Sequence, residues 1–123
     1  MDNRTGKIGE NYTAALLEQR GWQVLERNYH SRYGEIDIIA RDGQYIVFVE
    51  VKTRRSTGLD HPLAAVTKAK QQKLTKTALL YLAEHPEMQQ LDCRFDVAGL
   101  TTDSRGNMLR MDYIENAFEG EPV

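Results

Sequence analysis

From residue 34 to residue 52 the chain of 123 residues runs Gly34-Glu-Ile-Asp-Ile-Ile-Ala-Arg-Asp-Gly-Gln-Tyr-Ile-Val-Phe-Val-Glu-Val-Lys52. Two apolar runs flank the pair Asp42-Gly43. Asp-Gly is among the strongest short signals for a β-hairpin, because a type I′ turn needs positive φ at both central residues. With these two residues as the loop, Arg41 faces Gln44. The segment therefore predicts two antiparallel strands around which the rest of the chain can be assigned.

The two predicted strands carry charged residues that are unusual inside an apolar hairpin. Asp, Glu and Lys are rarely buried unless they are paired or bind a metal. In the predicted register Asp37 lies opposite Phe48 and Glu35 lies opposite Glu50, which makes Asp37 and Glu50 diagonal neighbours whose carboxylates can meet at one cation. Alternation gives one apolar face, made of Ile36, Ile38, Ala40, Val47, Val49 and Val51, and one charged face, made of Glu35, Asp37, Phe48, Glu50 and Lys52.

Three interpretations of the charged face remain open. The first is a partly exposed sheet surface on which Lys52 forms salt bridges with Glu50 and Asp37. The second is a divalent cation that relieves the repulsion between Glu35 and Glu50, since carboxylate oxygens suit Mg²⁺ or Mn²⁺. The third is catalysis, in which metal and lysine together stabilise the charge that develops on a phosphate under attack.

An Asp in one strand followed by Glu-x-Lys in the next, here Asp37 with Glu50-Val-Lys52, resembles the PD-(D/E)XK nuclease superfamily, which includes type II restriction enzymes and archaeal Holliday junction resolvases. Over about residues 4–118 the chain is also similar to the YraN family of endonuclease-like proteins. The segments that carry this wider similarity are Gly6-Lys-Ile-Gly-Glu10, Arg32-Tyr-Gly-Glu-Ile-Asp37, Phe48-Val-Glu-Val-Lys-Thr-Arg54 and Arg94-Phe-Asp-Val97. The resemblance implies an α/β fold with a restriction endonuclease-like core.

The superfamily scheme, transferred to the matching positions, implies a role for each of these residues. It implies Mg²⁺ or Mn²⁺ as cofactor, held by the carboxylates of Asp37 and Glu50 and by the backbone carbonyl of Val51. Lys52 would orient the attacking water and offset charge on the scissile phosphate. Glu10 would contact the metal directly or through water, so the implied catalytic set is Glu10, Asp37, Glu50 and Lys52. Glu35 is an additional candidate, either as a further acid at the site or as a surface partner for an arginine.

A helix is predicted from about Asn3 to Gln19, with Gly21 as its C-cap. One stripe of this helix is made of Gly6, Glu10, Ala14 and Leu17, and a second, apolar stripe is made of Ile8, Tyr12, Ala15 and Leu16. Glu10 thus heads a stripe of small and apolar residues, which suits a carboxylate that points along the sheet into a site. The alternative is an ordinary Glu near a helix N-terminus, which the helix dipole favours slightly.

Charge is unevenly distributed along the chain, although the net charge is only −2. Residues 52–76 contain seven Lys or Arg and one acid, whereas the remainder contains nine basic and seventeen acidic residues. A basic segment directly after the Glu-x-Lys strand would bring positive potential to the site and bind the phosphates of a nucleic acid. The candidate nucleic-acid-binding residues are Arg54, Arg55, Lys68, Lys70 and Gln71. The alternative is an ordinary solvated helix face.

The rest of the chain supplies further strands and a second helix. We predict strands over residues 22–30, 91–102 and 108–113, a helix over residues 63–84, and a final helical turn that docks Ile114, Ala117 and Phe118. The apolar stripe of the second helix would be Val66, Leu74, Ala78 and Tyr81. The predicted order is α-β-β-β-α-β-β, a mixed β-sheet of about five strands flanked by helices. We expect one domain over residues 1–123, with a core over about 4–118 and a short acidic tail.

Composition narrows the classes of protein that fit. A length of 123 residues suits one domain, and the single cysteine, Cys93, fits a reducing compartment without an internal disulfide. No Gly-rich phosphate loop or metal-type Cys/His spacing is present in the sequence. There is no apolar N-terminal run and no stretch of transmembrane length, so we expect a cytoplasmic protein that does not bind membranes.

The function that these residues favour is hydrolysis of DNA phosphodiester bonds by a metal-activated water. Branched, Holliday-junction-like DNA is a candidate substrate, and two symmetric cuts across a junction would require a homodimer. The alternative is a nucleic-acid-binding or assembly module on a nuclease-like scaffold, without physiological cleavage.

Overall fold

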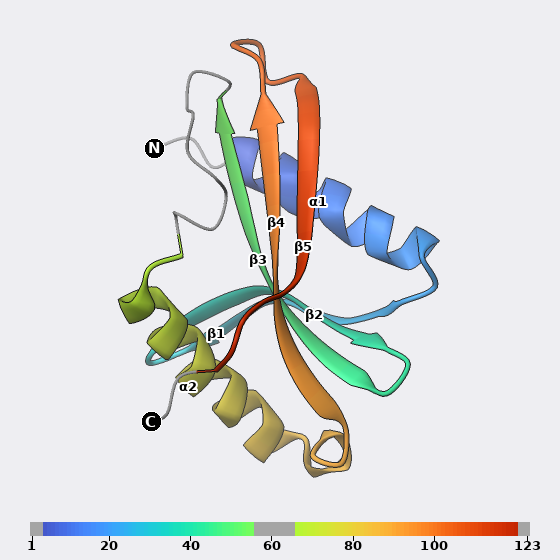
Figure 1. Cartoon of the computed structure of the whole chain (residues 1–123), viewed down its shortest axis with the longest axis vertical. Helices are drawn as coiled ribbons and strands as arrows, with labels where there is room; N and C mark the ends of the chain where they lie inside the picture. Colours follow the sequence, from blue (N-terminus) through green and yellow to red (C-terminus); the bar gives the residue numbers. More distant parts are fainter. Residues whose placement is uncertain (1–3, 56–65, 121–123) are drawn as a thin grey trace.

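The computed structural model describes residues 4–55 and 66–120 of the chain (Figure 1). Its helices and strands follow one another in the order predicted from the sequence. They are α1 (Arg4–Gln19), β1 (Gln23–Ser31), β2 (Gly34–Asp42), β3 (Tyr45–Arg55), α2 (Lys68–Glu84), the short 3₁₀ helix η2 (Pro86–Met88), β4 (Asp92–Thr102) and β5 (Met108–Phe118).

The five strands form one sheet in the order β1-β2-β3-β4-β5. β3 and β4 run parallel, whereas the other neighbouring strands run antiparallel. A parallel neighbour needs a crossover, and α2 lies in the connection that supplies it between β3 and β4. The predicted fold class is confirmed: a mixed sheet flanked by helices, in the order α-β-β-β-α-β-β, compatible with a restriction endonuclease-like core.

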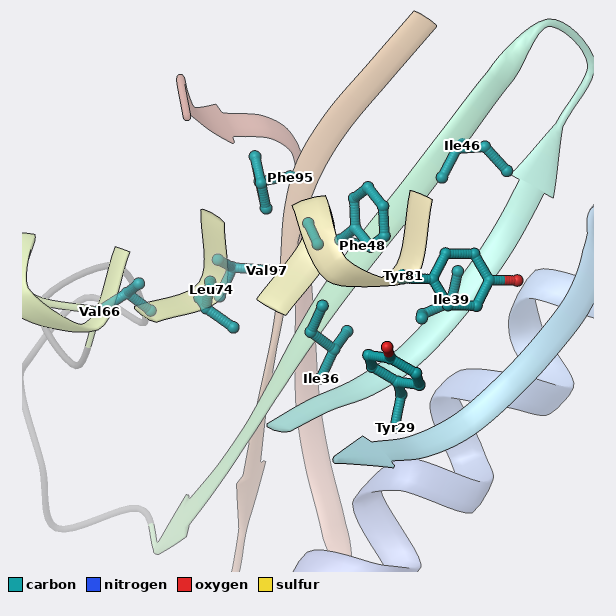
Figure 2. Close-up of a cluster of buried hydrophobic side chains, with 11 residues drawn as sticks. Tyr29, Ile36, Ile39, Ile46, Phe48, Val66, Leu74, Tyr81, Phe95 and Val97 are labelled. Atoms are coloured by element: carbon teal, nitrogen blue, oxygen red, sulfur yellow. The ribbon is translucent and has the colours of Figure 1, made fainter. Parts of the chain in front are cut away.

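The sheet separates two hydrophobic clusters, one under each helix. Figure 2 shows the cluster on the α2 side, where Tyr81 lies edge-on to Tyr29 and Phe48 at ring-centroid distances of 5.2 and 6.2 Å. The stripe predicted for the second helix is buried there: Val66, Leu74, Ala78 and Tyr81. The other cluster joins Ala14 and Leu17 of α1 to Ile38, Ala40, Val47 and Val49. The two helices therefore cover opposite faces of the sheet (Figure 1).

Helix α1 ends as the sequence predicts. Gly21 adopts a φ of 88°, its N–H donates to the carbonyl of Glu18, and the N–H of Trp22 donates to the carbonyl of Leu17 at 3.0 Å. This pair of bonds is the Schellman arrangement that a glycine at this position permits. The predicted residue Asn3 lies outside the described residues.

The second apolar stripe predicted for α1 is wrong. Ile8 is 52% exposed and Tyr12 is 47% exposed, because the sheet contacts only the flank of α1 that carries Ala14 and Leu17. Among the residues that the structure describes, no second layer covers the outer flank of this helix.

Helix α2 begins later than the predicted residue 63. Residues 63–65 lie outside the described part of the chain, and Val66 and Thr67 are not helical. Thr67 is the N-cap: its side-chain oxygen accepts from the N–H of Lys70 at 3.2 Å, so the helix starts at Lys68. Neither α1 nor α2, within the described residues, is long and apolar enough to cross a membrane.

The predicted register of the β2–β3 hairpin is wrong by two residues. Asp42 pairs with Tyr45, so the loop consists of Gly43 and Gln44. A positive φ of 58° occurs at Gly43 and not at Asp42, which is the pattern of a type II′ turn rather than a type I′ turn. A shift of two residues preserves the faces of a strand but changes every partner. Glu35 therefore does not lie opposite Glu50. On its other side, in the β1–β2 ladder, it pairs with His30.

Alternation along β2 breaks at Asp37. Ile36 belongs to the cluster under α2, whereas Ile38 belongs to the cluster under α1, so the prediction that both share one apolar face is wrong. The neighbouring strand is irregular at the same level, since Asn28 of β1 adopts a left-handed φ of 54°.

The final helical turn predicted from Ile114, Ala117 and Phe118 is wrong, because β5 continues as a strand to Phe118. Asn116 adopts a left-handed φ of 51°, and the pairing with β4 shifts between Phe95 and Val97. Such a bulge interrupts the period-two pattern of a strand and produces a spacing that resembles one helical turn. The acidic tail predicted over residues 115–121 belongs to β5 as far as Phe118.

Candidate functional site

The two acids of the Asp…Glu-x-Lys pattern meet where the β2–β3 ladder stops. Pairing ends at Ile38 and Val49, so Asp37 and Glu50 are the next residues on the two strands. The backbone N–H of Val51 donates to Oδ2 of Asp37 at 2.7 Å, and a hydrogen bond joins the carboxyl groups of Asp37 and Glu50. Continued by one residue, the observed register sets Asp37 opposite Glu50, and not diagonal to it as expected from the sequence.

This contact changes the protonation of the pair. The pKa of Asp37 is raised to about 8, first by burial and then by the hydrogen bond and negative charge of Glu50, against a smaller lowering by the Val51 N–H. Near neutral pH the metal-free protein therefore keeps a proton on Asp37. A bound divalent cation would replace that proton, because carboxylate ligands must be ionised. Two adjacent carboxylates of this kind fit Mg²⁺ or Mn²⁺.

Two lysines flank Glu50, which is only 7% exposed. The Nζ of Lys52 lies 3.9 Å from Oε1 of Glu50, and the Nζ of Lys70 on α2 lies 3.8 Å from Oε2. Both distances exceed the range of a hydrogen bond, so these ion pairs are loose. Burial lowers the pKa of Lys70, and the adjacent Lys52 lowers it further. The predicted salt bridge between Lys52 and Glu50 is thus present, although it does not hold the carboxylate tightly.

Glu10 reaches the site from α1 and is held by β1. Its Oε1 accepts hydrogen bonds from Nη2 and Nε of Arg27, at 2.9 and 3.1 Å, and from Nδ2 of Asn28 at 2.9 Å. The left-handed backbone of Asn28 aims its side chain at this carboxylate. Arg27 and Asn28 were not found by sequence reasoning, because a charged or polar residue in a strand ordinarily indicates a solvent-facing position.

A cavity of about 370 Å³ connects Glu10 with the Asp37 end of the carboxyl pair. The residues that line it are Gly6, Lys7, Glu10, Asn28, His30, Glu35, Asp37 and Val51. No group of three His, Cys, Asp or Glu side chains within residues 4–55 and 66–120 is already arranged around one metal position. Two carboxylates, those of Asp37 and Glu50, are in contact, and Glu10 stands across the cavity.

Glu35 lies at the rim of this cavity and is exposed. Its Oε2 is 3.2 Å from Nδ1 of His30, its cross-strand neighbour. Repulsion between Glu35 and Glu50, which the sequence-based register suggested as the reason for a cation, does not exist in this arrangement. The contact between Asp37 and Glu50 supplies that repulsion instead.

The predicted nucleic-acid-binding residues do not all point to the site. Arg54 and Arg55 lie at the end of β3 beyond Lys52, and Lys68 opens α2 at its exposed first turn. Lys70 reaches Glu50. The amide of Gln71 donates to the carbonyl of Val66 at 3.0 Å, so it holds the start of α2 rather than the carboxyl pair.

A second buried ionic cluster explains the Arg94-Phe-Asp96-Val97 motif. Asp96 is fully buried and accepts from Nε of Arg94 at 3.2 Å, from the hydroxyl of Tyr113 at 2.6 Å and from the N–H of Asn116 at 2.9 Å. Burial and the bond to Asp96 raise the pKa of the Tyr113 hydroxyl. These contacts fasten β5 to β4 and lie apart from the residues that line the cavity.

Comparison with known proteins identifies relatives of similar length. A family model described as "Uncharacterised protein family UPF0102" matches residues 9–100. A UPF0102 protein of Syntrophus aciditrophicus is 47% identical over 116 residues, which cover 94% of this chain and 89% of that protein. A UPF0102 protein of Dictyoglomus turgidum is 41% identical over 119 residues, covering 96% of this chain and all of that protein (100%).

Among solved structures, that of Pyrococcus furiosus SfsA in complex with Ca²⁺ is similar to this chain. The TM-score is 0.40 and the sequence identity is 15%. The match covers 90% of this chain and 62% of that chain, so this chain spans less than two thirds of the length of SfsA.

Proposed function

This chain belongs to the uncharacterised protein family UPF0102, and from its site we propose that it is a metal-dependent endonuclease of the PD-(D/E)XK type. The observation that carries the proposal is the contact between Asp37 and Glu50 at the end of the β2–β3 ladder. Structural ion pairs join opposite charges, whereas this contact joins two acids and raises the pKa of one of them. A cation bound between them would offset the repulsion of the two acids.

In the proposed site Asp37, Glu50 and the carbonyl of Val51 hold Mg²⁺ or Mn²⁺. The metal, when bound, supplies a Lewis acid that activates water and offsets charge on the phosphate. Glu10 would contact the metal directly or through a water molecule. Because Arg27 and Asn28 both donate to Oε1 of Glu10, Oε2 is the oxygen that we assign to this role.

Lys52 and Lys70 have separate roles in this proposal. Lys52 follows Glu50 on β3 and faces the same side, where its ammonium group orients the water and binds the scissile phosphate. Lys70 approaches the other oxygen of Glu50 from α2 and keeps that carboxylate in place. Its pKa is lowered first by burial and then by the adjacent ammonium group of Lys52.

The proposed substrate is DNA, with branched DNA the first kind to examine. Arg54, Arg55 and Lys68 extend the positive charge of Lys52 and Lys70 beyond the site, and cations of this kind bind a phosphate backbone without regard to sequence. A duplex or junction would lie across the end of β3 and the first turn of α2.

The experiment that tests the proposal is a gel assay with four-way-junction, flap and linear duplex DNA in Mn²⁺, Mg²⁺ or EDTA. We expect cleavage that requires metal and is lost in Asp37→Asn and Lys52→Ala. Asp92→Asn, an exposed acid at the start of β4, is the matched control and should retain activity. Equal cleavage by wild type, Asp37→Asn and Lys52→Ala would contradict the proposal, because the activity would then belong to a contaminant.

A second candidate function is a nucleic-acid-binding or assembly module without physiological cleavage. It is favoured by the lack, within the described residues, of a third side chain already grouped with Asp37 and Glu50 as a metal ligand. This alternative predicts that wild type shifts junction DNA on a native gel in EDTA, that Asp37→Asn does so equally, and that no metal leads to cutting.

A further inference from the structure

The turn between β1 and β2 is docked on α2 and carries an aromatic ring between two cations. The hydroxyl oxygens of Ser31 and Thr77 lie 3.0 Å apart, which fixes the turn to the helix. The guanidinium carbon of Arg32 is 5.0 Å from the centre of the Tyr33 ring, and the Nζ of Lys76 is 5.4 Å from it. Both distances lie within the range of a cation–π contact.

Beside this ring is a hollow of about 250 Å³ that the candidate active site does not use. It is lined by Tyr33, Lys76, Leu79 and Leu80, and Leu79 is 48% exposed. The hollow thus combines one aromatic and two aliphatic side chains with a cationic rim, and none of its four lining residues is acidic. An apolar surface of this kind, edged by positive charge, suits a ligand that is flat and apolar at one end and anionic at the other.

We propose that this hollow binds one unpaired nucleotide of the substrate, with its base against Tyr33 and Leu79 and its phosphate toward Arg32 and Lys76. Bases stack on aromatic side chains whatever their sequence, and neighbouring cations bind the backbone. The inference rests on the proposed function and narrows its substrate class to nucleic acid that contains a single-stranded or frayed segment. A base that is paired within a duplex has no free face to offer the ring.

The position of the hollow agrees with this role. Tyr33 lies in the turn directly before β2, four residues from Asp37 in the chain. His30 and Glu35, on either side of the same turn, line the active-site cavity. A strand with its scissile phosphate beside Asp37 would therefore reach Tyr33 within a few nucleotides.

The test measures binding in EDTA, so that it does not depend on cleavage. A fluorescently labelled single-stranded oligonucleotide and its blunt duplex are titrated with wild type, Tyr33→Ala, Tyr33→Phe and Tyr12→Ala, and the anisotropy is recorded. We expect Tyr33→Ala to weaken single-strand binding about tenfold or more, because stacking on the ring is lost. Tyr33→Phe should bind like wild type. Tyr12→Ala, which removes an exposed tyrosine from α1, is the matched control and should also bind like wild type.

Two results would overturn this inference: equal single-strand affinity of Tyr33→Ala and wild type, or wild-type binding that is no tighter for the single strand than for the blunt duplex. Failure of the nuclease proposal looks different. If Tyr33→Ala loses single-strand binding while wild type cuts nothing in Mg²⁺ or Mn²⁺, the nucleotide site stands and the nuclease proposal falls. If wild type cuts DNA while Tyr33→Ala binds single strands normally, the nuclease proposal stands and the nucleotide site falls.

Discussion

Asp37 makes the candidate site a source of instability when no cation is bound. Its pKa is raised because burial and the neighbouring Glu50 disfavour the carboxylate. The same group has an ordinary pKa in the unfolded chain, so over the interval between the two values the native state binds a proton that the unfolded state has lost. Stability therefore falls as pH rises through this interval. An asparagine at position 37 would avoid the loss but could not hold a metal as an anion.

We expect Asp37→Asn to stabilise the metal-free protein, and to do so more at pH 8 than at pH 5. Between the ordinary value of 3.8 and a pKa of about 8, Asp37 reduces the free energy of unfolding by up to about 1.4 kcal/mol per pH unit. Asparagine does not titrate, so the difference between the two proteins should grow with pH and then level off. Urea unfolding in EDTA across this pH range measures it.

The control for this prediction is Asp92→Asn, because Asp92 is an exposed acid of the same type at the start of β4. Its pH profile of stability should follow that of wild type. Parallel profiles for wild type and Asp37→Asn would show that the acid titrates normally, and the argument for a cation between Asp37 and Glu50 would lose its basis.

At the scale of secondary-structure elements, the packing of α1 on β3 determines how Glu10 approaches the site. A Cβ at Gly9 would lie 2.1 Å from Oγ1 of Thr53, so the helix backbone rests directly on the strand. Among the described residues, Oγ1 of Thr53 is buried and has no hydrogen-bond partner. The close approach at Gly9 places the next residue, Glu10, over β1 and the end of β2.

We expect Gly9→Ala to destabilise the protein by about 1–3 kcal/mol, because the added methyl group forces α1 away from β3. Thr53→Ala should restore most of this loss, since it removes the oxygen at 2.1 Å and leaves Thr53 Cβ at 3.4 Å as the nearest atom. Gly6→Ala, where nothing lies within 4 Å, is the matched control and should stabilise the helix by roughly 0.5–1 kcal/mol. Equal effects of Gly6→Ala and Gly9→Ala in urea unfolding would contradict the proposed contact.

The elements were predictable where local pattern decides them, and the irregularities were not. The helix stripes that pack on the sheet followed from periodicity. So did the part of the hairpin face that lies nearer the turn (Ile38, Ala40, Val47 and Val49), which survived an error of two residues in the register because side chains alternate. Asn28 and Asn116 adopt left-handed conformations through bonds to Glu10 and Asp96, which lie 18 and 20 residues away in the chain. Nothing local specifies such bonds.

The same distinction applies to the candidate site. Asp37, Glu50 and Lys52 stood out because charges in an apolar hairpin are rare. Arg27 and Asn28 gave no such signal, since β1 alternates poorly between polar and apolar residues and a strand edge tolerates both. Their role became visible only when α1 and β1 were brought together in space.

At the scale of the whole molecule, positive charge gathers at one end of β3. Arg54 and Arg55 pair with Thr101 and Thr102 at the end of the parallel β3–β4 ladder, and Lys68 opens the neighbouring helix. Arg41 lies near the other end of the hairpin, where it pairs with Ile46. Since the net charge of the chain is −2, binding to nucleic acid has to depend on this local patch rather than on the surface as a whole.

We therefore expect Arg54→Ala combined with Arg55→Ala to reduce the salt dependence of duplex binding. Each phosphate contact contributes about −0.9 to the slope of log K against log salt concentration. The loss of two contacts should therefore lower the magnitude of this slope by about 1.8. Anisotropy titrations in EDTA at increasing KCl measure the slope. Arg41→Ala, on β2 near the turn of the hairpin, should leave it unchanged. If Arg41→Ala reduced the slope as much as the double change does, nucleic acid would be binding over the general surface, and the end of β3 would have no special part in guiding a phosphate toward Lys52.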